Sequence, residues 1–465
     1  MGRINGFSKL ERNMIRYACL QLTLILGCLG ALNAQTGRVF WFGAPDATSG
    51  HNDQPIYLNL SAYDDSAYVT ITQPANSAFA PIALGIPANG SQRINLTPWI
   101  NGIETTLPDT VLNTGLFIQA SNDISAYYEI APSNNTDLFS LKADNALGNN
   151  FMISAQTYWR SATKYNPLPY NQAIIVATQD NTQVTIIPSN NVVGHPAGVP
   201  YTVNLNRGQT YMIKAIGLAT TDRFGGTEVV SDKPIAITIA DDSIENNNYG
   251  GCKDIIGDQT IPLDQIGSEY ILVKGFLGSR PDRVYIMGTE NNTDVTVDGG
   301  GPQDFSVNKG QIHELILSNP SVHMQATKDV YVMHVSGFGC EVGMAIVPSV
   351  YCTGSREVSF VRSQPDDFYI VVYVPNGAQG DFEINGDPNM LQAADFNAVP
   401  GTGGDWVAAR KYYNNFEIQI GNNYRVSNSA SNFHFGIING GSSTGCLYGY
   451  FTDFSGIVTG PIYRY

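Results

Sequence analysis

The chain has 465 residues, of which only 14% are charged, and its formal net charge is −15. An acidic chain without clustered Lys and Arg excludes nucleic acid as the expected partner, because phosphates are bound mainly by basic side chains. The 47 glycines, the abundant Tyr and Phe, and the lack of a long 3.6-residue apolar period after residue 35 predict an all-β fold.

The N-terminal segment has the pattern of an export signal. The stretch MIRYACLQLTLILGCLGALNAQ begins with Met14 and Arg16, continues as an apolar run, and ends in small residues at Ala34. This order is typical of a secretory signal peptide, so residues 1–34 are predicted to be removed. An alternative is that ILGC is a lipid-attachment motif that makes Cys28 an anchor. No later apolar run is long enough to span a bilayer, so the mature chain is expected to be secreted or on the cell surface.

Similar stretches recur along the chain. AYDDSAYVTI (62–71), ATQDNTQVTI (177–186) and GTENNTDVTV (288–297) each read as a strand, a turn and a second strand. The last two copies are followed by LNRGQTYMI and VNKGQIHELI, and then by VVSDKPIAITIA and MQATKDVYVMHV. Self-similarity of this kind predicts repeated structural units. We expect β repeats at 35–145, 146–260 and 261–346, and a degenerate fourth repeat at 347–465.

Within a repeat the apolar residues alternate with polar ones, as in PYTVNLN, which is the period of a half-buried strand. The second repeat is predicted to hold strands at 150–156, 172–179, 182–188, 200–206, 209–215, 227–231 and 235–241. Tandem antiparallel β-sandwich-like repeats are therefore expected, with a β-propeller-like arrangement as the alternative. The Asn of each DNT or NNT motif is predicted to form a hairpin turn, because Asn tolerates left-handed backbone geometry.

Four cysteines follow the predicted cleavage point: Cys252, Cys340, Cys352 and Cys446. Cys340 and Cys352 flank one predicted strand, so a disulfide between them is favoured in an exported chain. A Cys252–Cys446 bond would follow only if both of these residues are oxidised. No metal site is expected, because the chain has neither CxxC nor HxxxH spacing.

No catalytic or cofactor motif is apparent. His51 and Asp53 share a predicted loop, but no nucleophile or third metal ligand accompanies them in sequence. The acidic and amide-rich stretch from Ala240 to Asp254 lacks calcium-loop spacing and is interpreted as a solvated loop. The chain is therefore expected to have no cofactor and not to be an enzyme.

The segment from 155 to 172 is the predicted binding site. Its aromatic and basic residues have the composition of a binding hot spot, although the same aromatics would also suit the end of a sandwich. The candidate residues are Tyr158, Trp159, Arg160, Tyr165 and Tyr170.

Several motifs together resemble the IgG-Fc-binding protein N-terminal domain family. They are AIIVATQDNTQVTIIP, VPYTVNLNRGQTYMI, GTEVVSDKPIAI and GDQTIPLDQIGSEYILV, and GFGCEVGMAIVPSVYCTGS is similar to secreted bacterial, Bacteroidetes-like members. The resemblance implies an extracellular adhesive or ligand-binding protein that recognises a protein or glycan, without naming the ligand. A structural surface-layer or matrix component and a glycan-active enzyme are the alternatives.

Overall fold

The computed structural model describes residues 37–351 and 353–454, so the predicted signal peptide lies outside the described residues. The protein is all-β, with 52% strand and 6% helix, which confirms the predicted fold class. No helix in the described part of the chain is long and apolar enough to cross a membrane. The helices are single short turns between strands: η1 (Ser49–His51), η2 (Thr97–Trp99), α2 (Ile100–Ile103), η3 (Ala143–Ala146), η4 (Thr220–Asp222), η5 (Asn247–Tyr249) and η6 (Ala393–Asp395).

The strands form antiparallel sheets that follow one another along the chain, and we call the sheets of each region a unit. The first unit contains β1 (Gly37–Phe42), β2 (Ile56–Ala62), β3 (Ala67–Thr72), β4 (Ile82–Ile86), β5 (Ser91–Asn95), β7 (Leu116–Ile130) and β8 (Asp137–Leu141). The second contains β6 (Val111–Leu112), β9 (Gly148–Met152), β10 (Arg160–Ser161), β11 (Asn171–Ala177), β12 (Thr182–Ile187), β13 (Tyr201–Leu205), β14 (Thr210–Lys214), β15 (Glu228–Glu245) and β16 (Lys253–Gln259).

The remaining strands form two further units. The third unit contains β17 (Gly267–Val273), β18 (Asp282–Gly288), β19 (Thr293–Val297), β20 (Phe305–Val307), β21 (Ile312–Leu317), β22 (Ser321–Phe338) and β23 (Glu341–Ile346). The fourth has one sheet of β24 (Glu357–Val361), β26 (Phe382–Ile384) and β29 (Asn423–Asn428), and another of β25 (Asp367–Pro375), β27 (Asn397–Ala398), β28 (Trp406–Tyr413), β30 (His434–Gly441) and β31 (Gly445–Tyr450).

One long strand organises each of the first three units. The first half of β15 pairs with β12 and β9, and its second half pairs with β11 and β16. β7 and β22 change partners in the same way along their length. The predicted strands at 227–231 and 235–241 are therefore one strand, because the SDKP segment continues the strand between its two sets of partners, as ATKD does in the third unit. In the fourth unit the longer segment SNSASNF replaces it and separates β29 from β30.

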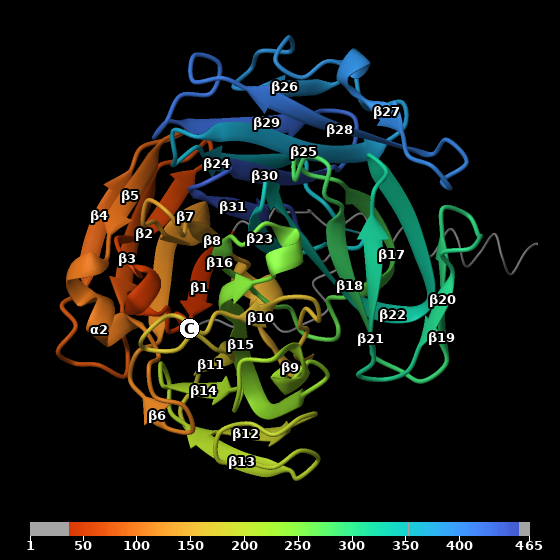
Figure 1. Ribbon diagram of the computed structural model, residues 1–465. Coiled ribbons are helices and arrows are strands. Elements are labelled where there is room, and N and C mark those ends of the chain that lie inside the picture. The colour runs from red at the N-terminus through yellow and green to blue at the C-terminus, as the bar shows by residue number, and fades with distance from the viewer. Residues whose placement is uncertain (1–36, 352, 455–465) are drawn as a thin grey trace, which may run out of the picture.

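The four units surround a common centre (Figure 1). The last strand of each unit lies innermost, and β8 contacts β16, β16 contacts β23, β23 contacts β31, and β31 contacts β8. Each of the first three units thus folds about one long strand, while the four units close into a ring. One apolar cluster includes Phe151 and Ile237 of the second unit together with Tyr285 and Met333 of the third. The core is therefore continuous across this boundary.

The repeated motifs assemble into one recurring turn structure. Asn181 and Asn292 have φ values of 54° and 56°, which confirms the predicted left-handed turns. The amide N–H of Asn181 donates to Asn206 Oδ1 at 3.1 Å, and Lys233 Nζ donates to the Asn181 carbonyl at 3.0 Å. In the third unit, Asn292 N–H donates to Asn308 Oδ1 at 3.0 Å. The NT pair, the NxGQ motif and the lysine recur together in the second and third units, because each supplies one side of the same hydrogen-bonded turn.

Candidate functional site

The turns that lead into the four inner strands meet at one end of the ring. Thr136 Oγ1 donates to the Thr444 carbonyl at 2.7 Å, Cys252 is bonded to Cys340, and Gly339 lies beside Ser442. These contacts join the first unit to the fourth, the second to the third, and the third to the fourth. We call this end the hairpin face, and define it by the turns at 131–136, 246–252, 339–340 and 442–444 with the loops that contact them.

Two of the predicted site residues lie between the second and third units. Tyr158 is half-buried, whereas Trp159 is only 2% exposed and belongs to the apolar core. Both rings contact Tyr249 of the turn at 246–252, and the Arg283 guanidinium lies 3.2 Å from the centre of the Tyr158 ring. Burial also raises the pKa of Tyr249. Trp159 is therefore a packing residue of this boundary and has no surface to offer a partner.

Arg160 has a solvent-exposed side chain beside the same turn. Its guanidinium Nη2 lies 2.7 Å from Glu245 Oε1, and Lys253 Nζ lies 3.3 Å from the other oxygen of that carboxylate. The Arg160 side chain is 51% exposed. An ion pair to a guanidinium with this much exposure contributes little to stability, so the Arg160 side chain is only weakly held.

The other two predicted residues lie between the first and second units. Tyr165 is half-buried and stacks on His51 with ring centres 4.3 Å apart, and Lys164 Nζ lies 4.7 Å from the Tyr165 ring centre. Tyr170 is also half-buried, and the centre of its ring lies 4.5 Å from Lys214 Nζ. The five predicted residues therefore occupy two neighbouring boundaries of the ring and do not form one patch.

A chain of buried polar groups holds the His51–Tyr165 stack in place. His51 Nδ1 lies 3.1 Å from Ser243 Oγ, which donates to Asp242 Oδ1 at 3.0 Å, and Asp242 Oδ2 accepts from Thr48 N–H at 2.7 Å. Ser243 has a φ of 43° at a β-bulge between Asp241 and Ile244. A positive φ is costly for serine, so the bulge is retained by its surroundings.

Burial shifts the pKa values of two groups in this chain. It is the main cause that raises the pKa of Asp242 to about 7. Burial also lowers the pKa of His51 to about 4, and the positive charges of Lys164 and Lys253 lower it further. Ser243 is fully buried, so it cannot receive a substrate. The interpretation of Ala240–Asp254 as a solvated loop is wrong for Asp241 and Asp242, because both lie buried on the second half of β15.

A third aromatic group, which no sequence pattern predicted, lies between the third and fourth units. Phe276 stacks on Tyr369 with ring centres 3.4 Å apart, and Tyr369 contacts Tyr412, which is 46% exposed. Arg410 lies 4.8 Å from the Phe276 ring centre and donates to the carbonyls of Lys274 and Gly275. These residues come from three distant segments, so no local pattern marks them as a group.

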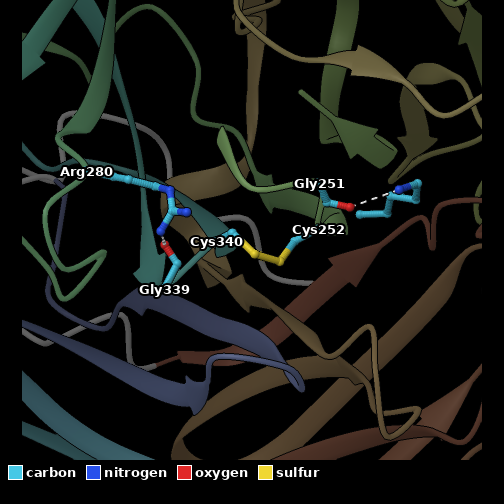
Figure 2. Close-up of a disulfide and its surroundings, with 6 residues drawn as sticks. Gly251, Cys252, Arg280, Gly339 and Cys340 are labelled. Atoms are coloured by element: carbon cyan, nitrogen blue, oxygen red, sulfur yellow. Dashed lines mark hydrogen bonds between the residues drawn. A yellow bond between two sulfur atoms is a disulfide. The ribbon is translucent and has the colours of Figure 1, made fainter. Parts of the chain in front are cut away.

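The predicted Cys340–Cys352 disulfide is wrong. Cys340 is bonded to Cys252, 88 residues away in sequence, and Cys352 lies outside the described residues (Figure 2). Cys352 is the nearest cysteine to Cys340 along the chain, but nearness in sequence does not decide the pairing. The ring places the turns before β16 and β23 side by side, and this brings the two sulfur atoms together. Among the described cysteines, Cys446 is a free, fully buried thiol.

Comparison with known proteins agrees with the resemblance noted in the sequence. No curated protein matches the chain. A family model described as IgGFc binding protein matches residues 139–441, which is more than half of the chain and runs from β8 of the first unit to the end of β30 in the fourth. The chain therefore belongs to the IgGFc-binding protein family.

Proposed function

We propose that this protein is secreted or held at the cell surface, and that it binds an extracellular protein or glycan through the hairpin face. The observation that carries the proposal is the recurrence of aromatic rings beside a cation at three unit boundaries on this face. Tyr and Arg are enriched among residues that dominate binding energies, because they offer large contact areas and directional hydrogen bonds.

The architecture of the face supports binding. Its loops are fixed by hydrogen bonds to other loops of the same unit, for example from Asn52 Nδ2 to Asn134 Oδ1 at 3.0 Å and from Asn246 Nδ2 to the Tyr158 carbonyl at 3.1 Å. Loops that are already ordered lose little conformational entropy when a partner binds. A protein partner is the first to test, because the family description names the Fc region of IgG.

The test compares two double variants on the hairpin face with a control on the opposite end of the first unit. Arg160→Ala with Tyr165→Ala removes one candidate side chain from each of two neighbouring boundaries, and Arg410→Ala with Tyr412→Ala removes part of the aromatic–cation group at the third boundary. Tyr68→Ala is the control, since Tyr68 is 59% exposed on β3, which pairs with the half of β7 farther from the turn. The probes are an IgG Fc fragment and an array of glycans and mucins.

At least one double variant should bind the recognised probe about tenfold more weakly, which corresponds to about 1.4 kcal/mol. Its thermal midpoint should stay close to that of the unchanged chain, and Tyr68→Ala should bind normally. Normal binding by both double variants would place the site elsewhere. Regular lattices of the purified chain, without binding to either probe, would favour the matrix alternative.

A further inference from the structure

Two sulfur atoms and a carboxylate converge at the centre of the hairpin face. Cys252 Sγ, Cys340 Sγ and one carboxylate oxygen of Glu341 all lie within 4.8 Å of one another. Cys252 precedes β16 and Cys340 precedes β23, so the group bridges the second and third units. Both cysteines are half-exposed, whereas Glu341 is buried.

Two buried carboxyl groups lie beside the disulfide. Glu341 Oε2 and Asp254 Oδ1 of the neighbouring strand accept no hydrogen bond from an N–H or hydroxyl group of the described residues. Asp254 is only 2% exposed, and its side chain is hydrogen-bonded to that of Glu341. Two carboxyl groups can be hydrogen-bonded to each other only if one of them holds a proton, so the pair carries one buried negative charge. The disulfide cannot offset this charge, whereas a bound cation can.

The positively charged Arg280 side chain lies next to Cys340. Arg280 Nη1 donates to the Gly339 carbonyl at 2.9 Å (Figure 2). A methyl group placed on Gly250 would meet both Arg280 Nη2, at 2.9 Å, and Cys340 Sγ, at 3.2 Å, so the guanidinium and the sulfur are near neighbours. A positive charge beside a cysteine stabilises its thiolate, which is both the better leaving group and the form that binds metals.

We propose that the Cys252–Cys340 disulfide is reducible, and that its dithiol form binds one zinc ion through Cys252, Cys340 and Glu341. Zinc favours a tetrahedral set of sulfur and oxygen ligands, with Zn–S distances of about 2.3 Å and Zn–O distances of about 2.0–2.2 Å. A water molecule would complete the set. Asp254 acts as a positioning residue that orients Glu341 through their hydrogen bond. Two thiolates, one carboxylate and Zn²⁺ carry one net negative charge, which Arg280 offsets.

The chemistry balances with a phosphine as reductant. Its phosphorus takes up the oxygen of one water molecule and becomes a phosphine oxide, while the two hydrogens of that water and two electrons convert the disulfide to two thiols. Zinc then displaces a proton from each thiol. The link between the second and third units thus changes from a covalent bond to a metal bridge. The lack of CxxC and HxxxH spacing in the sequence does not exclude this site, because its ligands come from different units.

The experiment measures bound zinc in the full chain before and after treatment with tris(2-carboxyethyl)phosphine, followed by removal of free metal. The reduced chain should retain one zinc ion more than the oxidised chain, and X-ray absorption should show two sulfur ligands. Cys252→Ser should abolish this ion, and Glu341→Gln should weaken its binding at least tenfold. Glu290→Gln is the matched control, since Glu290 is an exposed carboxylate of the third unit, paired with Lys328.

Comparing bound zinc in the variants distinguishes zinc held at this site from zinc held by the other cysteines of the chain. Equal zinc content in the reduced unchanged chain and in reduced Cys252→Ser would overturn the proposal. So would a bound zinc ion without sulfur ligands. If Cys252→Ser does not fold, Glu341→Gln decides, because it keeps both thiols, and unchanged zinc affinity in this variant would remove Glu341 from the site. The test does not measure binding of the Fc fragment or of glycans, so its outcome for the zinc site is independent of the proposed function.

Discussion

At the scale of single residues, the repeated asparagines matter for the backbone angle that they permit. Asn181 and Asn292 sit in the left-handed region at equivalent turns, where alanine costs about 1–2 kcal/mol and glycine costs little. Asn181→Ala should therefore lower the free energy of unfolding by about 1 kcal/mol, while Asn181→Gly should stay close to the unchanged chain. Urea unfolding measures both. Equal loss in the two variants would mean that the amide side chain, and not the backbone, is what the turn requires.

The buried histidine His434 should make the protein sensitive to acid. His434 is 1% exposed and stacks on Tyr373, and burial lowers its pKa to about 3. In the unfolded chain it would take up a proton near pH 6.5, so between about pH 6.5 and 3 the unfolded state binds more protons than the folded state. Stability should therefore fall as the pH drops through this window.

His434→Phe keeps an aromatic ring against Tyr373 and removes the titrating group. Urea midpoints of this variant, measured from about pH 7 to about pH 4, should fall less steeply than those of the unchanged chain. Parallel pH profiles would show that other groups control the acid sensitivity. Carboxyl groups with raised pKa values, such as Asp242, act in the opposite direction, because their folded form keeps a proton that the unfolded form has lost.

At the scale of elements, the disulfide links two strands of the inner ring that are far apart in sequence. It closes a loop with a sequence separation of 88 residues, and cross-links over loops of this size stabilise by about 2–5 kcal/mol, mainly by restricting the unfolded chain. The double variant Cys252→Ala with Cys340→Ala should lose stability of this order in thermal unfolding. Cys352→Ala should not, since Cys340 is already bonded. A large loss in Cys352→Ala would instead favour the bond expected from sequence.

At the scale of the whole molecule, closure of the ring predicts cooperative unfolding. The inner strands contact one another around the centre, and the core is shared between the second and third units. Calorimetry should therefore show one transition, whereas independent tandem units would show several.

The contact that closes the ring can be tested at one glycine. Gly445 has a φ of 88°, and a Cβ there would lie 2.4 Å from the Thr136 amide nitrogen of the first unit. Gly421 has a φ of 79° and has open space around its Cβ position, so Gly421→Ala is a control for backbone strain alone. Gly445→Ala should cost about 2 kcal/mol or more and should shift the whole calorimetric transition. A separate early transition would show that the first and fourth units open without the rest.

The sequence by itself determined the features that depend on near neighbours along the chain. Strand periodicity, the left-handed Asn turns and the recurrence of the motifs were all readable, because alternation and turn chemistry act within a few residues. The burial and grouping of the aromatic residues were not readable. No sequence pattern separates the buried Trp159 from the exposed Arg160, or joins Phe276 to Tyr369 and Tyr412.

Only the tertiary structure decided which cysteines pair, which aromatics are buried and how the units are arranged. Each of these depends on contacts between residues that lie far apart in the chain, such as Cys252 with Cys340 or His51 with Tyr165. Composition makes a tyrosine or tryptophan suitable for either a core or an interface, and the packing of neighbouring units selects between them. The ring closes because the inner strands bury apolar surface against other units, and that preference is set by the whole molecule.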